Sequence, residues 1–459
     1  MNLRQRFAEF GTNRFVRSVG VLVGGTAFGH AITMLALPVV TRLYTPSDFS
    51  VLAVFTAVVA MVSVAACLRF DVAIPIPQSD GDAINVLGLA LTCTLAVSVV
   101  LAACVLGAPD LVVGWLHQPE LVPHLWLLPI GVMLAGAYSA LQFWFVRKKE
   151  FASIARTRIA QSSACAGAQI GLGGLGLAPL GLLLGLMLNT GAGCVGLGYR
   201  LWRTDGKLLR ALNWPQMRAL FSTYQRFPKY STLEALCNSA SMQIPIIMIA
   251  ALASGPEAGF LVLAMYAMQA PMALIGNAVA QVYMSRAPEE HRSERLGSFT
   301  VDVFGGLLKT GVGPLLLAAI LAPELFALVF GQEWRRAGVL VSWMAPWFVM
   351  QFLSTPVSMA LHVTGHQRAA LVLQWGGLVI RVAAVYAASL LARDFVSEAY
   401  ALSGGLFYLI YLAVLLRLVS APAVGIAAKV RDALPVICVG GVAGSVAALA
   451  LHVLRLAVL

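Results

Sequence analysis

The sequence TRLYTPSDFS, residues 41–50, separates two long apolar segments and decides how the start of the chain folds. Arg42 stands at the end of the first apolar segment. Pro46 cannot continue a helix that comes from before it, and its fixed φ angle suits the first turn of the next helix. We therefore predict two helices joined by a short polar turn.

The composition places the whole chain in a membrane. Its 459 residues are 59% hydrophobic and 11% charged, whereas soluble proteins carry roughly 25% charged residues. The mean hydropathy is +0.84. Several apolar runs reach the roughly 20 residues that cross a bilayer as a helix. We predict an all-α polytopic membrane protein with helices near 19–41, 50–68, 83–106, 125–146, 159–177, 179–199, 230–253, 257–283, 299–321, 338–363, 370–391, 398–416 and 435–456.

The charges predict the orientation. The net charge of +11 does not indicate a nucleic-acid partner, because most basic residues lie in short loops between apolar runs. With a cytoplasmic N-terminus, the inside loops carry 24 Lys and Arg residues and the outside segments five, as the positive-inside rule expects. The stretch from Arg4 to Arg17 is predicted to be a cytoplasmic amphipathic lead-in rather than a cleavable signal.

Two echoes in the sequence predict an internal repeat. The turn GPEAGF at 255–260 places Pro256 where Pro46 stands in the first copy, and APDL at 108–111 returns as APEL at 322–325, each pair at a helix-connecting turn. We predict six-helix lobes at 1–210 and 211–420, related by a pseudo-two-fold axis along the membrane normal, and an extra transmembrane helix within 421–459. In such transporters the binding site lies between the halves.

No motif for catalysis or metal binding is present. The seven cysteines lie within or beside apolar runs without a CxxC pair, and His30, His362 and His366 are isolated. No HExxH, P-loop, GxSxG or Rossmann fingerprint occurs. We predict a protein that is not an enzyme and that carries no metal or cofactor.

Several motifs together resemble a known family. TRLYTPSDF, RFDVAIPIP at 69–77, FPKY at 227–230, GPEAGFLVLA at 255–264, FGQEWRRAG at 330–338 and STPVSMALHVTGHQ at 354–367 keep the order seen in Wzx-type O-antigen or exopolysaccharide repeat-unit flippases. These proteins share a superfamily with lipid II flippases and with multidrug and toxin extrusion transporters. Ser50 departs from the glycine that often follows the first motif in the family.

The resemblance implies a function. The substrate would be an undecaprenyl-diphosphate-linked oligosaccharide, moved across the bacterial inner membrane from the cytoplasmic to the periplasmic face by two six-helix bundles around a central cavity. The polysaccharide polymerase and the chain-length regulator would be candidate partners. We expect a monomer, because one chain contains both lobes.

Charged residues inside the predicted helices are candidates for binding the diphosphate. Arg381 and Lys309 lie near the middle of their helices, where a charge is costly and should face a cavity or a partner. Interhelical pairing is the alternative for both residues. Arg42 and Arg69 flank the second helix and either contact the substrate or snorkel to lipid head groups.

Polar residues on other helices are candidates for binding sugar or a coupling ion. The predicted sugar-binding residues are Asn238, Gln243, Gln269, Asn277 and Gln281, and the predicted ion-coupling residues are Glu234 and Asp302. Interhelical hydrogen bonding is the alternative for the amides. The competing functions are a cation- or proton-coupled multidrug or metabolite antiporter and a membrane glycan polymerase or ligase. The antiporter would favour an acidic site, and the enzyme a large outside loop, whereas the longest predicted outside loop has about 18 residues.

Overall fold

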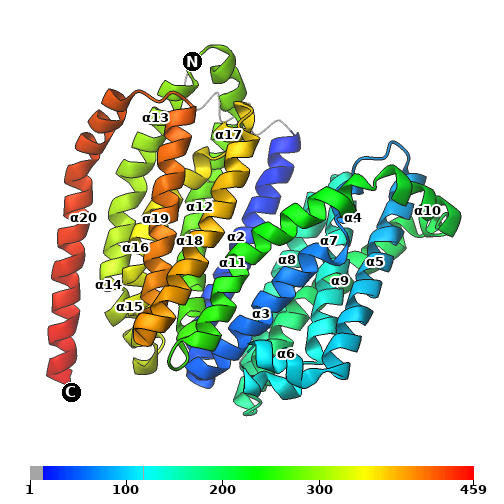
Figure 1. Ribbon diagram of the computed structural model, residues 1–459, viewed down its shortest axis with the longest axis horizontal. Coiled ribbons are helices and arrows are strands. Elements are labelled where there is room, and N and C mark those ends of the chain that lie inside the picture. The colour runs from blue at the N-terminus through cyan, green and yellow to red at the C-terminus, as the bar shows by residue number, and fades with distance from the viewer. Residues whose placement is uncertain (1–13, 117, 459) are drawn as a thin grey trace. The chain divides into compact units, whose positions relative to one another are not determined.

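The protein is helical throughout the part that the structure describes. The structure is a computed structural model that describes residues 14–116 and 118–458 (Figure 1). Residues 4–13 of the predicted lead-in lie outside this range. Within the described residues, ten helices are long and apolar enough to cross a membrane, and a bent helix pair at 332–357 makes up to eleven. The predicted all-α polytopic membrane fold is confirmed.

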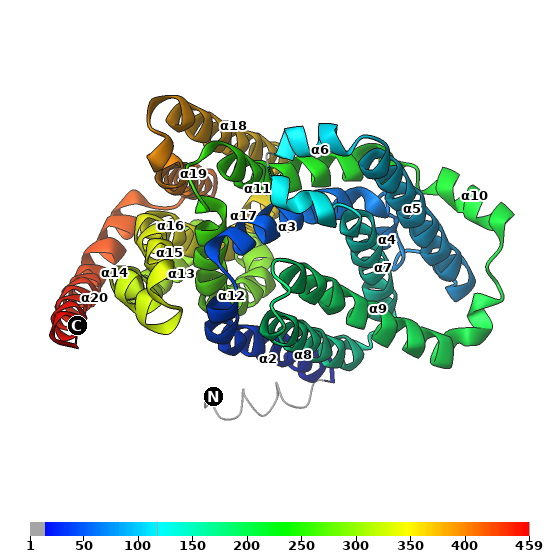
Figure 2. The same cartoon turned by 90° about the horizontal axis from the view of Figure 1, so that it is seen from below.

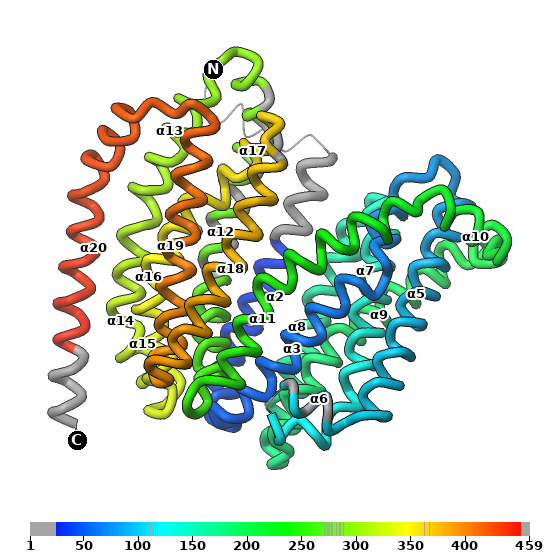
Figure 3. The backbone as a smooth tube through the Cα atoms, viewed as in Figure 1, coloured from blue at the N-terminus to red at the C-terminus, as the bar shows by residue number. Residues whose placement is uncertain are grey.

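The chain forms two compact units, Met1–Gln243 and Ile244–Leu459, whose boundary falls inside helix α11 (Thr232–Leu252). Figure 3 traces the backbone of each. The lobe limits at 210 and 420 rest on the sequence repeat and stay a prediction.

The turn at 41–50 forms as predicted. Helix α2 (Arg14–Leu43) ends just before it, and helix α3 (Pro46–Ala66) begins at Pro46. Thr45 is the N-cap residue, and its backbone N–H donates to the Asp48 carboxylate over 2.8 Å. The Asp48 N–H donates back to the Thr45 hydroxyl over 3.3 Å. This capping box satisfies two backbone donors that a helix start leaves unpaired, so proline and capping together fix the start of α3.

The rest of unit 1 packs around α7 and α8. After α3 the chain runs through α4 (Phe70–Ala73), α5 (Asp80–Gly107), α6 (Pro109–Leu116), η1 (Pro119–His124), α7 (Leu127–Arg147), α8 (Phe151–Gly174), α9 (Leu180–Leu209), α10 (Trp214–Thr223) and the π-helix η2 (Phe227–Ser231). Helix α8 packs against both α2 and α9 (Figure 2). A Cβ atom on Gly25 would lie 2.6 Å from that of Ala155, so glycine permits the close approach of α2 and α8.

Unit 2 contains the remaining helices. They are α12 (Glu257–Arg292), α13 (Leu296–Leu307), η3 (Leu308–Val312), α14 (Gly313–Val329), η4 (Gln332–Trp334), α15 (Arg335–Trp343), α16 (Ala345–Ser354), η5 (Thr355–Val357), α17 (Ala360–Val363), α18 (Gln367–Leu391), η6 (Arg393–Phe395), α19 (Val396–Leu418) and α20 (Ala423–Val458). Its core joins α12, α13, α16 and α19. Segments predicted as inside loops are partly helical, because α12 continues to Arg292 and α20 begins at Ala423.

The second echo does not lie at a turn, so that part of the repeat argument is wrong. Pro109 begins α6, but Pro323 lies inside α14, which continues to Val329. Pro323 has no N–H to donate to the Ala319 carbonyl four residues earlier. The Ser342 hydroxyl of α15 donates to that carbonyl over 2.6 Å instead. A partner from a neighbouring helix thus lets the proline remain inside α14.

The single helix predicted at 338–363 is also wrong. The chain bends by 50° between the segments Gln332–Trp343 and Ala345–Val357. Pro346 lies in the first turn of α16, where it cannot donate to a carbonyl of α15 and where its ring disfavours a helical conformation for the preceding residue. Proline therefore sets this break, as it sets the start of α3.

The C-terminal helix α20 packs against α13 and α14, and small residues lie at its contact with α14 (Figures 1 and 2). A Cβ atom on Gly440 would lie 2.7 Å from the carbonyl oxygen of Gly313 and 2.8 Å from its Cα atom. These are backbone atoms, which cannot rotate away as a side chain can. The two helices therefore approach each other as closely as their backbones allow.

We predict that Gly440→Val lowers the stability of the protein, because the added side chain overlaps the backbone of Gly313. Overpacking of this kind costs about 1–3 kcal/mol. The matched control is Gly441→Val, since a Cβ atom there meets nothing within 4 Å. Thermal unfolding of the two purified variants in detergent measures the difference. Equal melting temperatures would contradict the close contact between α14 and α20 at Gly313 and Gly440.

Candidate functional site

Arg381 is a cation held among aromatic rings inside unit 2. It lies in the middle of α18 and is only 3% exposed. Its guanidinium carbon is 5.2 Å from the ring centre of Trp347, 4.6 Å from that of Phe407 and 5.8 Å from that of Tyr408. These rings come from α16 and α19, and we call the three of them the aromatic cage. The cage and Arg381 of α18 thus bring three helices together around one charge. Cation–π attraction is strongest where water is excluded.

Glycines allow the cage to close around the arginine. A Cβ atom on Gly377 of α18 would lie 2.6 Å from the Phe407 ring, and one on Gly404 of α19 would overlap the Trp347 ring. The aromatic side chains thus occupy space that any other residue at these two positions would fill.

The charge of Arg381 is not matched by a carboxylate. In the described part of the chain no ion pair joins it, and neither its Nε nor its Nη2 atom has a hydrogen-bond partner. These two atoms form one edge of the guanidinium, the edge that binds a carboxylate or phosphate through two parallel hydrogen bonds. Arg381 therefore presents an unused bidentate edge in a buried setting.

Lys309 and Asp302 face α20. Lys309, in the π-helix η3, lies 3.5 Å from Asp432, and Asp302 of α13 accepts from Lys429 over 2.8 Å. These contacts are the third-party pairing that the sequence left open for Lys309. Both pairs are substantially exposed, so each contributes little to stability. Substrate or ion binding by these residues stays a prediction.

The two arginines that flank α3 differ in their settings. Arg42 is exposed in the last turn of α2. Arg69 is half-buried in a left-handed conformation with φ of 59°, at the break between α3 and α4, and its Nε atom has no hydrogen-bond partner among the residues that the structure describes.

The predicted polar residues lie along α11 and α12 without forming one described cluster. Glu234, Asn238 and Gln269 are exposed, and Gln243 is half-buried. The side chains of Asn277 and Gln281 lie outside the described residues. Their roles in binding sugar or a coupling ion stay predictions.

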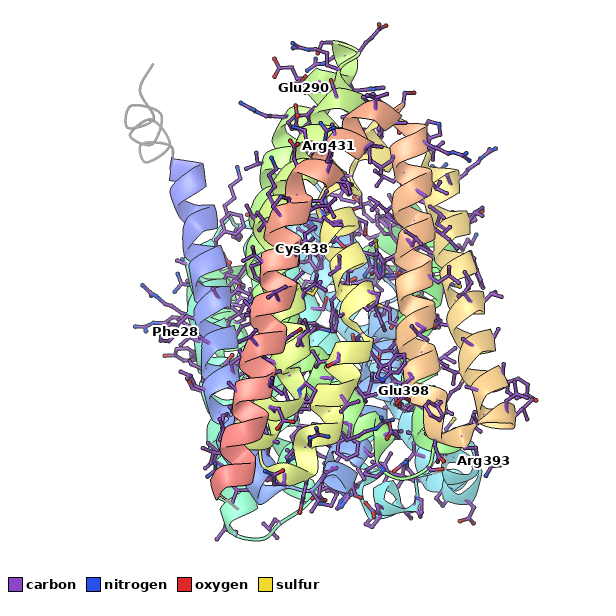
Figure 4. The ribbon with its side chains drawn as sticks, turned by 90° about the vertical axis from the view of Figure 1, so that its left-hand side faces the viewer. Phe28, Glu290, Arg393, Glu398, Arg431 and Cys438 are labelled. Atoms are coloured by element: carbon purple, nitrogen blue, oxygen red, sulfur yellow. The ribbon has the colours of Figure 1, made fainter. Side chains whose placement is uncertain are left out.

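Sequence reasoning missed a second charged cluster in unit 2. Arg336 at the start of α15 donates to both oxygens of Glu257 over 2.9 and 3.2 Å, and its Nη1 atom lies 2.6 Å from Oε1 of Glu398. The carboxylates come from the first turns of α12 and α19. Figure 4 places Glu398 and Arg393 near one end of the unit and Glu290 and Arg431 near the other. We call Glu257, Arg336 and Glu398 the end clamp, because they join three helix starts.

A signal for the end clamp exists in the sequence. Glu257 and Glu398 each follow a turn directly before an apolar run, and Arg336 lies just before another. A negative side chain at a helix start is favourable by itself, so these positions did not indicate a shared partner.

The family of the chain follows from its sequence profile. A family profile described as "Polysaccharide biosynthesis protein" matches residues 39–338. This range includes the turn at Pro46, Arg69 and Arg336. The chain belongs to this family. A comparison with curated proteins finds no match.

Solved structures share the fold of this family member. The lipid II flippase MurJ in an inward closed conformation matches with a TM-score of 0.69 at 9% identity, over 95% of this chain and 98% of that one. A multidrug resistance transporter of the MATE family, in an inward-facing conformation, matches with a TM-score of 0.60 at 14% identity, over 85% and 94% of the two chains. A transporter of the MOP superfamily from Pyrococcus furiosus matches with a TM-score of 0.51 at 14% identity, over 87% and 95%. At such identities the likeness shows the fold alone, which this chain shares with the lipid II flippase and the MATE transporter.

We predict that Arg336→Met destabilises the protein much more than Arg335→Met. Removing one partner of a buried ion pair leaves an unpaired charge, at a cost of about 3–5 kcal/mol. Arg336 is partly exposed, so we expect about 2 kcal/mol. Arg335 is the adjacent control, because its single ion pair with Glu324, at 2.9 Å, involves a more exposed guanidinium and its loss should cost below about 1 kcal/mol. Thermal unfolding compares the two variants, and equal losses would contradict the end clamp.

Proposed function

We propose that this protein is a flippase that moves an undecaprenyl-diphosphate-linked oligosaccharide repeat unit from the cytoplasmic to the periplasmic face of the bacterial inner membrane, for O-antigen or exopolysaccharide synthesis. Membership in the polysaccharide biosynthesis family supports a glycan-related role. The observation that carries the proposal is Arg381, a buried cation for which the described residues offer no carboxylate partner. It favours an anionic substrate over the cationic drugs that an acidic site would select.

The head group of such a substrate sets the chemical problem. A diphosphate must cross a roughly 30 Å apolar layer, while the polyprenyl tail can remain in lipid. Fixed cations and hydrogen-bond donors have to replace the water around the phosphates. A guanidinium edge meets two phosphate oxygens at once, whereas an ammonium acts as a point charge. In Arg336 the Nε and Nη2 atoms already bind a carboxylate in this way, and in Arg381 the same two atoms are unpaired.

The aromatic cage has a role in this proposal. In the absence of substrate the three rings stabilise the Arg381 charge through cation–π attraction. The cation–π attraction is weaker than the attraction in a bidentate hydrogen-bonded pair, in which the anion offers two oxygen acceptors. Phosphate therefore competes with the rings for the guanidinium. The cage thus holds the arginine in place, with a hydrogen bond to Tyr408, and leaves the Nε and Nη2 donors without a partner among the described residues.

The remaining parts of the proposal follow the sequence predictions. We place the N-terminus in the cytoplasm, because the predicted inside loops carry most of the Lys and Arg residues. Lys309, Arg42 and Arg69 are secondary candidates for the diphosphate, and the amides of α11 and α12 are candidates for the sugar. We take the working unit to be one chain, with the polymerase and the chain-length regulator as candidate partners.

The function is tested by deleting the gene in its own cells. Lipid-linked repeat units are then assayed on the two faces of the inner membrane, and surface polysaccharide is measured beside them. We expect repeat units to accumulate on the cytoplasmic face and surface polymer to be lost. Single repeat units that reach the periplasm without polymerising would point to a polymerase or ligase. Unchanged polysaccharide with altered sensitivity to cationic drugs would point to an antiporter.

We predict that Arg381→Ala abolishes surface polysaccharide while the protein still inserts into the membrane, and that Arg381→Lys is partly active. The lysine keeps the charge but loses the bidentate edge. Membrane abundance and melting temperature are measured for each variant, so that a folding defect is recognised. Arg335→Met is the control, because it removes a cation that already has a carboxylate partner. Normal polysaccharide in the Arg381→Ala strain would rule out Arg381 as the anion site.

A further inference from the structure

The exposed side chains of α9 mark the point where this helix leaves the lipid. Along the candidate span they change from apolar to aromatic to basic in the direction of the chain. Val195 is exposed, and the exposed rings of Tyr199 and Trp202 follow, with ring centres 6.3 Å apart. The exposed charged residues that come next are Arg203, Lys207 and Arg210. Aromatic rings gather at the level of the lipid head groups, so the end of α9 lies at the membrane surface.

Helix α10, which follows α9, is held at the same level on the first turns of α5. The backbone N–H of Asn213 donates to the Asn85 side chain over 2.8 Å, and Asn85 donates to the Ala211 carbonyl over 3.0 Å. Gln216 donates to Asp82 over 2.6 Å. Farther along α5, the exposed apolar side chains are Leu95, Val99 and Val100. Helix α10 therefore lies beside the point where α5 enters the apolar layer, at the edge of unit 1 (Figures 1 and 2).

One face of α10 packs against the protein and another is exposed. Met217 is buried beside Gly88 of α5, and Leu220 packs against the core of unit 1. Trp214 and Arg218 are one turn apart on another face, and the Trp214 side chain is 65% exposed. The exposed residues that alternate between basic and apolar here, which we call the surface strip, are Arg210, Leu212, Trp214 and Arg218.

The segment that carries the surface strip is almost entirely positive in charge. Residues 200–229, all of which the structure describes, contain seven Lys and Arg residues and one acidic residue, Asp205. Asp205 accepts a hydrogen bond of 3.1 Å from the Trp144 indole and lies 3.6 Å from Lys148. The single carboxylate of the segment is therefore already engaged and does not balance the strip.

The acidic residues at the start of α5 are engaged as well. Asp80 forms ion pairs with Arg147 over 3.0 Å and with Lys148 over 2.7 Å. Asp82 accepts from Gln216, the contact that holds α10 in place. Because Lys148 reaches both Asp80 and Asp205, it also holds the start of α5 and the end of α9 at one level.

We propose that the surface strip binds the head groups of anionic phospholipids and lies in the head-group layer of the bilayer. Its arginines would pair with lipid phosphates, while Trp214 and Leu212 reach the boundary of the acyl chains, as in interfacial helices. The positive-inside rule accounts for the number of basic residues but does not require exposed apolar residues between them. The bilayer already lies at this level beside α5 and α9, so it covers the strip without a further partner.

This inference goes beyond the proposed function and does not depend on it. The surface strip lies between α9 and α11, in the segment that leads to the boundary between the two units after Gln243. Lipid that holds the strip therefore acts, through the chain itself, on the segment that connects one unit to the next.

The head-group test measures the melting temperature of the purified full chain in detergent while phosphatidylglycerol or phosphatidylcholine is added. We expect phosphatidylglycerol to raise the melting temperature more than phosphatidylcholine does. Arg218→Gln should raise the phosphatidylglycerol concentration that gives half of the shift by about fivefold, the factor that one basic residue contributes near an anionic surface. The matched control is Arg156→Gln of α8, which removes the same charge from an exposed position in unit 1 and should keep the wild-type value.

Three results would overturn the lipid site. Equal shifts with the two lipids would mean that the charge of the head group is not recognised. Equal losses in Arg218→Gln and Arg156→Gln would mean that only the total charge of the protein matters. The same shift with inorganic phosphate alone would mean that the strip binds a small anion rather than a lipid surface.

Trp214 gives a second readout in bilayers. The fluorescence that Trp214→Phe removes from the wild-type spectrum is the emission of Trp214. We expect this emission to be much weaker in phosphatidylglycerol bilayers with brominated acyl chains than in unbrominated ones, because bromine quenches tryptophan on contact. Equal emission in the two bilayers would mean that Trp214 lies outside the lipid. Neither measurement depends on glycan export, so a failure of the flippase proposal would not affect them.

Discussion

The cost of burying a charge in an apolar, lipid-embedded fold constrains the rest of this structure. An ion that leaves water must find a partner, a set of dipoles or a ligand. In the end clamp two carboxylates share one guanidinium, and Oε2 of Glu398 is buried without a hydrogen-bond partner among the described residues. Asp48 meets it with the donors of a helix cap. Arg381 and Asp71 are buried without an ion partner among the described residues, so they are where the protein can gain free energy by binding something.

The two exceptions differ in the sign of their charge. Arg381 offers two N–H donors on one edge of a planar cation, which matches an oxyanion. Asp71 has one buried carboxylate oxygen without a hydrogen-bond partner among the described residues. Each lies within one compact unit, held by helices whose packing depends on glycine or on a strained turn. A flippase for a diphosphate-linked glycan has to neutralise an anion, which suits the unpaired guanidinium edge of Arg381.

Sequence reasoning predicted the features that depend on one residue and its neighbours. The helix start at Pro46 and the burial of Arg381 inside the protein follow from local rules, and both are confirmed. It failed where a distant helix supplies a partner. Pro323 does not end its helix, because Ser342 satisfies the carbonyl that the proline leaves free. Glu257 and Glu398 are 141 positions apart and meet only through Arg336, which no local pattern can show. Pairing of Lys309 was left open, but the sequence did not identify the partners of Asp302 and Lys309, since these lie on α20, more than a hundred residues later in the chain.

We have proposed that this chain moves an anionic, lipid-linked glycan and that Arg381 binds its anion. The most direct measurement reconstitutes the purified protein in liposomes with a polyprenyl-diphosphate-linked oligosaccharide and follows, with an external glycosidase, how much glycan becomes accessible. We predict that wild-type protein exposes the glycan of the inner leaflet over time, and that Arg381→Met, at equal reconstitution, leaves it protected. Equal exposure by the wild-type and Arg381→Met proteins would contradict the role of Arg381, and no exposure beyond that of empty liposomes by either protein would contradict the flippase itself.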